Sequence, residues 1–140
     1  MRDVIGVVVV THGQLATELL NAAEMIVGDL PTFTAVSIGW HDDVDDARDE
    51  IVQAIERVDG REGILVLTDM FGGTPSNIGM TLLDKDRVEV ITGVNLPMLI
   101  KLAGLRSSSD LLSVARQMRD HGRNAIWVAS DLMRTEKANE

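Results

Sequence analysis

A single histidine marks the junction between an apolar segment and an amphipathic segment near the start of the chain. The stretch VVVVTHGQLATELL covers residues 7–20, and His12 is the ionisable group at this junction. An imidazole can attack phosphorus through one nitrogen when the other nitrogen holds a proton that an acceptor takes. A carboxylate is a good acceptor, so His12 is a candidate nucleophile if a carboxylate lies beside it.

Asp69 is the carboxylate that could lie there. It belongs to LTDMFGGTPSN, residues 67–77, which also follows an apolar run and also carries glycine before an expected helix. A helix N-terminus presents free N–H groups and the positive end of the helix dipole to an anion, and glycine lets the backbone come close. The junctions THGQ and FGGTP therefore predict a phosphate pocket that contains His12 and Asp69.

Four short apolar runs indicate how these junctions are positioned. They alternate with longer segments of helical periodicity, which is typical of βαβ units around a parallel sheet. Three of the runs are nearly continuous in hydrophobic residues, which suits strands covered on both faces. The predicted fold class is α/β, with an open, mostly parallel sheet flanked by helices. The runs are residues 5–11, 33–39, 63–69 and 88–93.

The carboxyl ends of the first and third runs are the expected place of the site. In open parallel sheets, ligands bind outside the carboxyl ends of the strands, where successive connections go to opposite sides. If the third strand inserts on the side of the first strand away from the second, His12 and Asp69 face each other across that crevice.

Five helical segments are expected between and after the runs. The first ends near Gly28. The second follows HDDVDDARDE, which we interpret as a solvated helix start because it lacks the oxygen spacing and the glycine of a calcium loop. Thr74 is the expected N-cap of the third helix, with Pro75 in its first helical position. The last two are a short helix around residues 96–104 and a longer one across residues 108–122.

The C-terminal part of the chain contains one more apolar run. NAIWVAS, residues 124–130, is predicted to be a fifth strand whose direction periodicity does not settle. Residues 133–140 predict a flexible tail, so a single domain is expected over residues 1–132. With 45% hydrophobic and 25% charged residues, a chain of 140 residues can bury one core without metals or disulfides.

Composition excludes several classes of protein. The chain has no cysteine, which excludes disulfides and thiolate metal sites, and neither a metal nor another cofactor is expected. A net charge of −9 without a cluster of lysine and arginine argues against a nucleic-acid partner. No run approaches the roughly 20 residues of a membrane helix, and no signal peptide opens the sequence, so a cytoplasmic protein is expected.

Other residues near the two junctions are candidates for the pocket. Asn95, in GVNLPM after the fourth run, could reach the same edge, although an asparagine-containing turn is the default explanation. His41 is better explained by a loop or cap, and His121 by a helix end, where an imidazole favours the dipole. His12 and Asp69 each have a structural explanation when taken singly, but their convergence favours chemistry. The remaining candidates are Thr11, Gly13, Thr68, Phe71, Gly72, Gly73 and Thr74.

Three stretches of the sequence resemble the enzyme IIA domains of the mannose family of the bacterial phosphoenolpyruvate sugar phosphotransferase system (PTS). VTHGQLATELLNAAEMIVGD resembles the opening of these domains, and LTDMFGGTPSN and GVNLPML match the other two signature segments. The stretches occur in the right order and at the right distances, and the resemblance extends from about Val4 to about Leu102. Three ordered motifs are much more specific than any one of them.

The resemblance implies a phosphohistidine carrier that accepts a phosphoryl group from the phosphocarrier HPr and passes it to an enzyme IIB, which serves the membrane sugar permease. His12 matches the phosphorylated histidine of the family, and Asp69 matches the carboxylate that hydrogen-bonds it. A homodimer is also implied, in which the last strand, here residues 124–130, lies antiparallel in the partner's sheet. The best-known members carry a linker to a IIB domain, so for this chain a separate IIB polypeptide is expected.

Three other functions compete with this interpretation. The phosphotransfer subunit of dihydroxyacetone kinases shares the fold and the histidine, but FGGTPSN and GVNLPM are closer to the sugar branch. A regulatory module that signals carbon supply needs the same pocket as a carrier, so the sequence does not separate the two. A histidine phosphatase would carry Arg-His-Gly, whereas Thr11 stands in place of that arginine and offers no guanidinium to bind phosphate through two hydrogen bonds.

Overall fold

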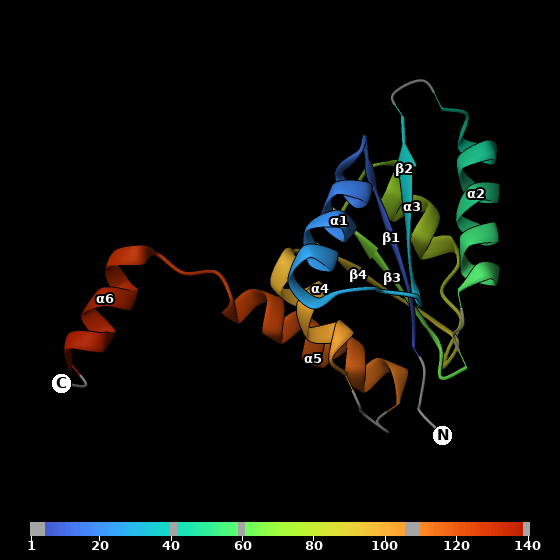
Figure 1. Ribbon diagram of the computed structural model, residues 1–140. Helices are drawn as coiled ribbons and strands as arrows, with labels where there is room; N and C mark the ends of the chain where they lie inside the picture. The colour runs from blue at the N-terminus through green and yellow to red at the C-terminus, as the bar shows by residue number, and fades with distance from the viewer. Residues whose placement is uncertain (1–4, 40–41, 59–60, 106–109, 139–140) are drawn as a thin grey trace.

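A parallel sheet of four strands forms the centre of the protein, as the computed structural model shows (Figure 1). The structure describes residues 5–39, 42–58, 61–105 and 110–138. All three strand pairings are parallel. The α/β class and the four predicted strand positions are confirmed. The strands are β1 (Gly6–His12), β2 (Phe33–Ile38), β3 (Ile64–Thr68) and β4 (Val88–Thr92), in the spatial order β2-β1-β3-β4.

Helices follow each strand, and the last two occupy the C-terminal part of the chain. Among the described residues, no helix combines the length and the apolar character needed to cross a membrane. The helices are α1 (Leu15–Val27), α2 (Val44–Arg57), α3 (Thr74–Thr81), α4 (Leu96–Ala103), α5 (Leu111–Asn124) and α6 (Ala129–Ala138).

The first five helices cover both faces of the sheet, so the body of the protein has three layers (Figure 1). On one face, α1, α4 and α5 pack against Val7 and Val9 of β1 and their neighbours. On the other face, α2 and α3 pack against Val8 and Val10. All four valines are at most 1% exposed. Burial of such a side chain contributes about 1.5–3 kcal/mol, which explains the continuous apolar run at the centre of the sheet.

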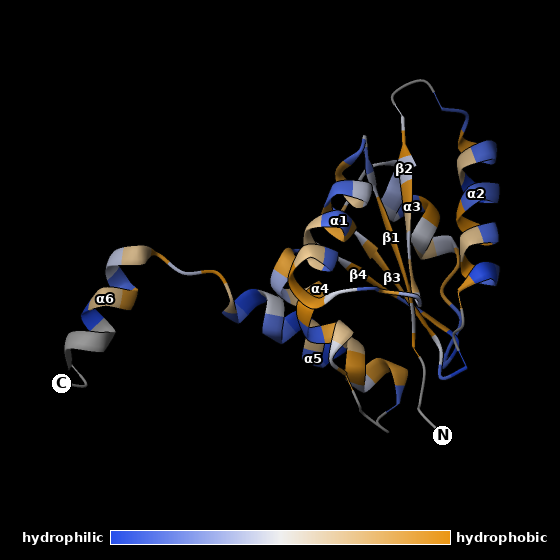
Figure 2. Cartoon of the chain, in the orientation of Figure 1, coloured by the Kyte–Doolittle hydropathy of each residue, from blue (hydrophilic) through white to orange (hydrophobic). Residues whose placement is uncertain are grey.

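The helix α2 shows how the local sequence produces one of these elements. Asp43 caps it, because its side chain accepts a hydrogen bond of 2.7 Å from the Asp45 N–H. Its inner face consists of Ala47, Ile51 and Ala54, which are all buried, while its outer face is hydrophilic (Figure 2). The acidic stretch is thus a helix start, as the sequence predicts.

The start of α3 differs from the prediction by one residue. Gly73 is the N-cap, so Thr74 is the first helical residue and Pro75 the second. The chain turns into this helix through Gly72 and Gly73, whose φ angles are +90° and +91°. Such angles strain a residue that carries a Cβ atom. The turn therefore ends on a glycine, and the cap falls there instead of on the threonine.

The predicted fifth strand is not confirmed in the single chain. The chain leaves α5 after Asn124, and residues 125–128 form neither strand nor helix. This segment leads away from the sheet toward α6 and meets no strand of its own chain (Figure 1). Its large apolar side chains are exposed, at 75% for Ile126, 59% for Trp127 and 65% for Val128.

The helix α6 spans the predicted domain boundary. It begins at Ala129 and continues through Ala138, so residues 133–138 of the predicted tail are helical. Within it, Asp131 and Arg134 form an ion pair across one turn, which supports an exposed helix. The boundary predicted at residue 132 therefore falls inside this helix.

Thr11 joins β1 to α1 and provides a test of this junction. Its side chain is fully buried, and Oγ1 accepts a hydrogen bond of 2.7 Å from the Ala16 N–H in the first turn of α1. Thr11→Val keeps the shape but removes the acceptor. We expect the free energy of unfolding, measured by urea denaturation, to fall by about 1–2 kcal/mol.

The matched control is Thr34→Val in β2, which makes the same exchange at a half-buried strand position. Its free energy of unfolding should stay within about 0.5 kcal/mol of the wild-type value. An equal loss in both variants would show that the hydrogen bond at Thr11 contributes nothing special.

Candidate active site

The strand order brings the carboxyl ends of β1 and β3 side by side. The strand β2 pairs with one edge of β1, and β3 pairs with the other edge. The register pairs Val10 with Thr68, so the two strands end at nearly the same level. His12 is the last residue of β1, and Asp69 directly follows β3. Both residues therefore lie at the predicted point, where the connections from β1 diverge to opposite sides.

One carboxylate oxygen of Asp69 contacts His12 twice. Its Oδ2 lies 2.8 Å from Nδ1 of the imidazole and 3.2 Å from the backbone nitrogen of the same residue. A carboxylate oxygen accepts hydrogen bonds, so Nδ1 donates its proton to it and the lone pair of the neutral ring is placed on Nε2. The hydrogen bond at Nδ1 therefore orients the ring, and the lone pair on Nε2 can attack an incoming group.

The two side chains differ in their access to solvent. The imidazole of His12 is 49% exposed, whereas the carboxylate of Asp69 is only 15% exposed. Asp69 Oδ1 is buried, and no hydrogen-bond partner for it lies among the described residues. A carboxylate in this position can support positive charge on the ring while an incoming group approaches the exposed imidazole.

Gly72 and Gly73 form the turn beside the imidazole. A Cβ atom on Gly73 would lie 3.0 Å from both Nε2 and Cε1 of His12, closer than side chains normally pack. A Cβ atom on Gly72 would meet nothing within 4 Å. Only the absence of a side chain at Gly73 therefore keeps the backbone this close to the ring without covering Nε2.

The two helix starts at this edge are not equivalent. One N–H group in the first turn of α1 is already hydrogen-bonded, because Thr11 accepts a hydrogen bond from the Ala16 N–H. The N-cap of α3 is Gly73, which forms no side-chain cap. Free N–H groups and the positive helix end favour an anion next to the ring. The site is thus suited to a phosphoryl group on Nε2 with its oxygens toward α3.

A family comparison agrees with this geometry. The sequence profile of the EIIA-man family, described as "PTS system fructose IIA component", matches residues 6–118. The chain belongs to this family. PTS IIA components are phosphotransferase-type proteins, and the predicted family is confirmed.

Individual relatives of this IIA protein support the assignment. It is 33% identical over 132 residues to the "PTS system mannose-specific EIIAB component" of Escherichia coli (strain K12), an alignment that covers 87% of this chain and 39% of that protein. The "PTS system fructose-specific EIIA component" of Bacillus subtilis (strain 168) is 27% identical over 138 residues, covering 97% of this chain and 94% of the relative. The chain thus spans about two-fifths of the length of the first relative and nearly all of the second.

Solved structures share its architecture. The "Mannose/sorbose specific IIA subunit of phosphotransferase system from Enterococcus faecalis" superimposes with a TM-score of 0.79 at 26% sequence identity. The superposition covers 91% of this chain and 95% of that structure. The three-layer fold of this IIA protein is therefore that of other PTS IIA subunits.

Several residues that the sequence suggested for the pocket form hydrogen bonds within the fold and not with the His12 imidazole. Thr11 and Thr68 are fully buried; the Thr68 hydroxyl donates to the Met70 carbonyl over 3.4 Å. The Asn95 side chain caps α4 through Met98 N–H and donates to the carbonyl of Gly122 in α5. Its two polar atoms are therefore engaged with these helices, so Asn95 caps a helix where the sequence predicted a turn.

The other candidates lie in the turns themselves. Gly13 follows His12 and donates its N–H to the Ile38 carbonyl over 2.9 Å. Phe71 is 73% exposed in the turn after Asp69. Thr74 stands in the first turn of α3.

The other histidines lie outside this constellation. His121 lies in the last turn of α5, as predicted. His41 lies outside the described residues. Among the residues that the structure describes, no group of three histidine, aspartate or glutamate side chains could hold a metal ion.

The sequence analysis missed Ser76. This residue is 0% exposed, and its Oγ accepts a hydrogen bond of 2.8 Å from the Gly72 N–H. The available signal was a serine in the first turn of a helix that follows two glycines, because such hydroxyls often bond to nearby backbone groups.

Gly72 and Gly73 allow a matched test of the ring's surroundings. Both have φ near +90°, so alanine strains the backbone equally at either position, but only Gly73→Ala places a methyl group against His12. We expect the rate at which diethylpyrocarbonate modifies His12 to fall by roughly 5- to 10-fold in Gly73→Ala, equivalent to about 1–1.4 kcal/mol. Peptide mass spectrometry assigns the modification to His12. A similar fall in Gly72→Ala would attribute the effect to backbone strain.

Proposed function

We propose that this IIA protein carries a phosphoryl group on Nε2 of His12, accepts it from phospho-HPr and passes it to an enzyme IIB for sugar uptake. The observation that carries the proposal is the 2.8 Å hydrogen bond between Nδ1 and Asp69 Oδ2 on a half-exposed ring. This bond orients the ring and leaves the Nε2 lone pair for an incoming phosphorus.

The chemistry needs no other nucleophile. The Nε2 lone pair attacks the phosphorus of the donor, a nitrogen–phosphorus bond forms, and the bond to the donor's leaving group breaks with its electron pair going to the donor. Nδ1 keeps its proton, so the ring gains positive charge, which the carboxylate of Asp69 stabilises. The uncapped first turn of α3 favours the phosphoryl oxygens. The same steps in reverse deliver the group to the acceptor.

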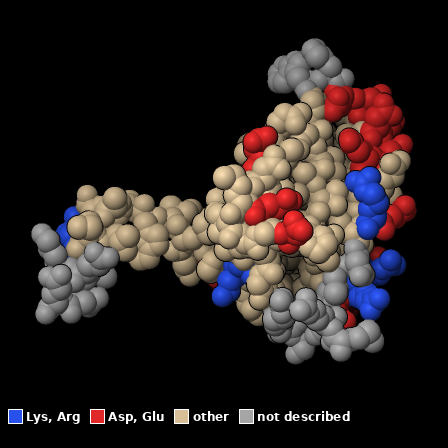
Figure 3. All heavy atoms as spheres, in the orientation of Figure 1, with Lys and Arg blue, Asp and Glu red and all other residues tan. Residues whose placement is uncertain are grey.

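An acidic surface supports a donor with a basic docking face. The helix α2 begins after the carboxyl end of β2, next to β1, so its N-terminus lies at the same edge of the sheet as His12. Acidic side chains gather over this helix (Figure 3). Such a field attracts a positively charged partner and repels nucleic acid. The exposed acidic residues at its start are Asp42, Asp43, Asp45, Asp46, Asp49 and Glu50.

The sugar-transport role is preferred over the two related roles. The relatives above carry names of sugar-specific PTS components, for mannose and for fructose. A subunit of a dihydroxyacetone kinase would pass the phosphoryl group to a different acceptor, and a regulatory module would pass it to none. Transfer from the phosphorylated protein to a purified IIB separates these roles.

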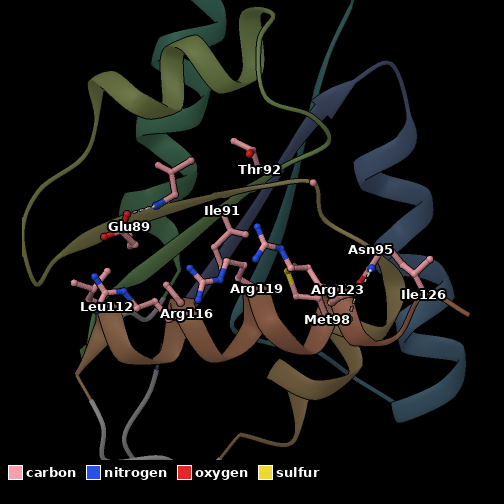
Figure 4. Close-up of a pocket in the computed structure, with 14 residues that line it drawn as sticks. Glu89, Ile91, Thr92, Asn95, Met98, Leu112, Arg116, Arg119, Arg123 and Ile126 are labelled. Carbon is pink, nitrogen blue, oxygen red and sulfur yellow. Dashed lines mark hydrogen bonds between the residues drawn. The ribbon is translucent and has the colours of Figure 1, made fainter.

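A homodimer is the second part of the proposal, and the C-terminal segment supports it. Ile126, Trp127 and Val128 are exposed in an extended stretch that has no sheet edge of its own. The strand β4 is an edge strand, and a groove of about 420 Å³ separates it from α5 (Figure 4). When two copies exchange their C-terminal segments, each segment can pair with the open edge of the partner's sheet.

The groove has polar features that suit a chain segment. Three arginines of α5 extend from the helix toward β4 (Figure 4). Of these, Arg119 also bonds to the neighbouring Asp120 over 2.9 Å, and this hydrogen bond lowers the pKa of Asp120 below its usual value. These side chains offer hydrogen-bond donors along the groove, whereas at the edge of β4 the Val88 and Val90 N–H groups are bonded to the Asp84 carbonyl and to the Glu89 side chain. The three arginines are Arg116, Arg119 and Arg123.

The carrier role predicts labelling of a single residue. Phosphoenolpyruvate, enzyme I and HPr should together label the protein at His12, with a bond that is labile in acid and stable in alkali. His12→Ala should accept no label, since among the described residues it is the His12 ring that has Nδ1 bound to a carboxylate and Nε2 left open. Label that persists in this variant would refute the assignment.

Asp69→Asn tests the carboxylate. The exchange keeps the shape but removes the charge, and the amide can turn its NH₂ toward the ring and favour the wrong tautomer. We expect phosphorylation of His12 by phospho-HPr, measured by rapid quench, to slow by at least ~10-fold, or roughly 1.4 kcal/mol. Circular dichroism should show an intact fold. A folded variant with the wild-type rate would make Asp69 a structural residue.

Sedimentation tests the dimer. The full-length protein should sediment at twice the 15.3 kDa mass of one chain. Trp127→Asp places a charge in the exchanged segment and should yield monomers, whereas Val44→Asp, at an exposed position of the helix α2 that packs on β1 and β2, should remain dimeric. A wild-type monomer at micromolar concentration contradicts the proposal.

A further inference from the structure

The turn that borders Nε2 has little packing of its own. Met70 and Phe71 are 54% and 73% exposed, and Gly72 and Gly73 carry no side chains. The position of this turn therefore depends on hydrogen bonds at its two ends. At its start, Asp69 is held by its two contacts with His12.

Ser76 holds the other end of the turn. Its Oγ accepts the Gly72 N–H over 2.8 Å and lies 3.5 Å from the Gly73 carbonyl oxygen, to which it donates. The side chain is 0% exposed, so its hydroxyl has neither solvent nor a partner protein to bind. The same hydroxyl thus ties both glycines to the first turn of α3.

This contact acts on the nitrogen that the proposed function uses. Gly73 lies so close to the imidazole that even a Cβ atom there would be 3.0 Å from Nε2. A small shift of the turn toward the ring would cover Nε2, and a shift away would move the start of α3 from the phosphoryl oxygens. A misplacement of about 1 Å can cost up to 10²-fold in rate.

We infer that Ser76 is a positioning residue for phosphoryl transfer: its hydroxyl fixes the Gly72–Gly73 turn at the distance that leaves Nε2 open and α3 in reach. The assignment rests on the proposed carrier function. Because Ser76 is buried, it touches neither the donor nor the phosphoryl group and acts through the turn alone.

The closing experiment separates transfer from docking. In Ser76→Ala the maximal rate of His12 phosphorylation should fall by roughly 10-fold. The phospho-HPr concentration at half-saturation should stay unchanged, because the docking surface is intact. Thr81→Ala is the matched control, since it removes a hydroxyl that bonds to the Ile78 carbonyl at the other end of the same helix. Its maximal rate should equal that of the wild type.

Hydrogen exchange of the Gly72 amide tests the contact independently of activity. In the wild type this amide should exchange slowly for a surface turn, and in Ser76→Ala it should exchange rapidly. A rapidly exchanging Gly72 amide in the wild type overturns the inference even if the variant fails to fold.

Kinetic outcomes distinguish the two proposals. A wild-type protein that phospho-HPr does not label overturns the carrier function and this assignment with it. A labelled wild type with a Ser76→Ala maximal rate within twofold of its own, or with a change in half-saturation alone, overturns the assignment to Ser76 and leaves the carrier function standing.

Discussion

The site depends on one carboxylate oxygen that joins the ends of two neighbouring strands. Asp69 Oδ2 accepts from both the backbone nitrogen and Nδ1 of His12, at 3.2 and 2.8 Å. This contact exists only because β3 lies directly beside β1, which follows from the strand order β2-β1-β3-β4. A simple sequential order would place β2 between them, and the two side chains would be separated by a full strand. The strand order of the sheet thus decides whether Asp69 can contact His12.

The helices α1 and α3 both start at this edge of the sheet, but their first turns differ in their hydrogen bonds. In the first turn of α1, the Ala16 N–H is bonded by the Thr11 side chain, and this contact contributes to the fold. The start of α3 has a glycine at the cap and leaves its first turn open toward the ring. The N-cap residues Gln14 and Gly73 both form no side-chain cap, so the hydrogen bond from Ala16 to Thr11 is what distinguishes two junctions that look alike in the sequence.

Much of this arrangement could be predicted from the sequence, for identifiable reasons. Long apolar runs and helical periodicity determine the strands and helices, and the glycine-bearing junctions mark the edge where His12 and Asp69 meet. The cap of α3 was misplaced because the positive φ of Gly73 is a property of the turn, not of the Thr-Pro pattern. Residues 124–130 satisfy a strand pattern, but a strand needs a partner strand, and these residues pair with no strand of the single chain. Ser76 was missed because its importance lies in burial, which a lone serine does not reveal.

The double contact of Asp69 with His12 has a consequence for the order of events. With its backbone nitrogen and Nδ1 tied to the same oxygen, the imidazole cannot turn over to present another nitrogen without breaking that contact. In the proposed carrier role, a donor and an acceptor both approach this one exposed nitrogen, so they cannot occupy the site together. The two partners would then bind in alternation, and the dissociation rate of each partner would set an upper limit on the overall rate of transfer.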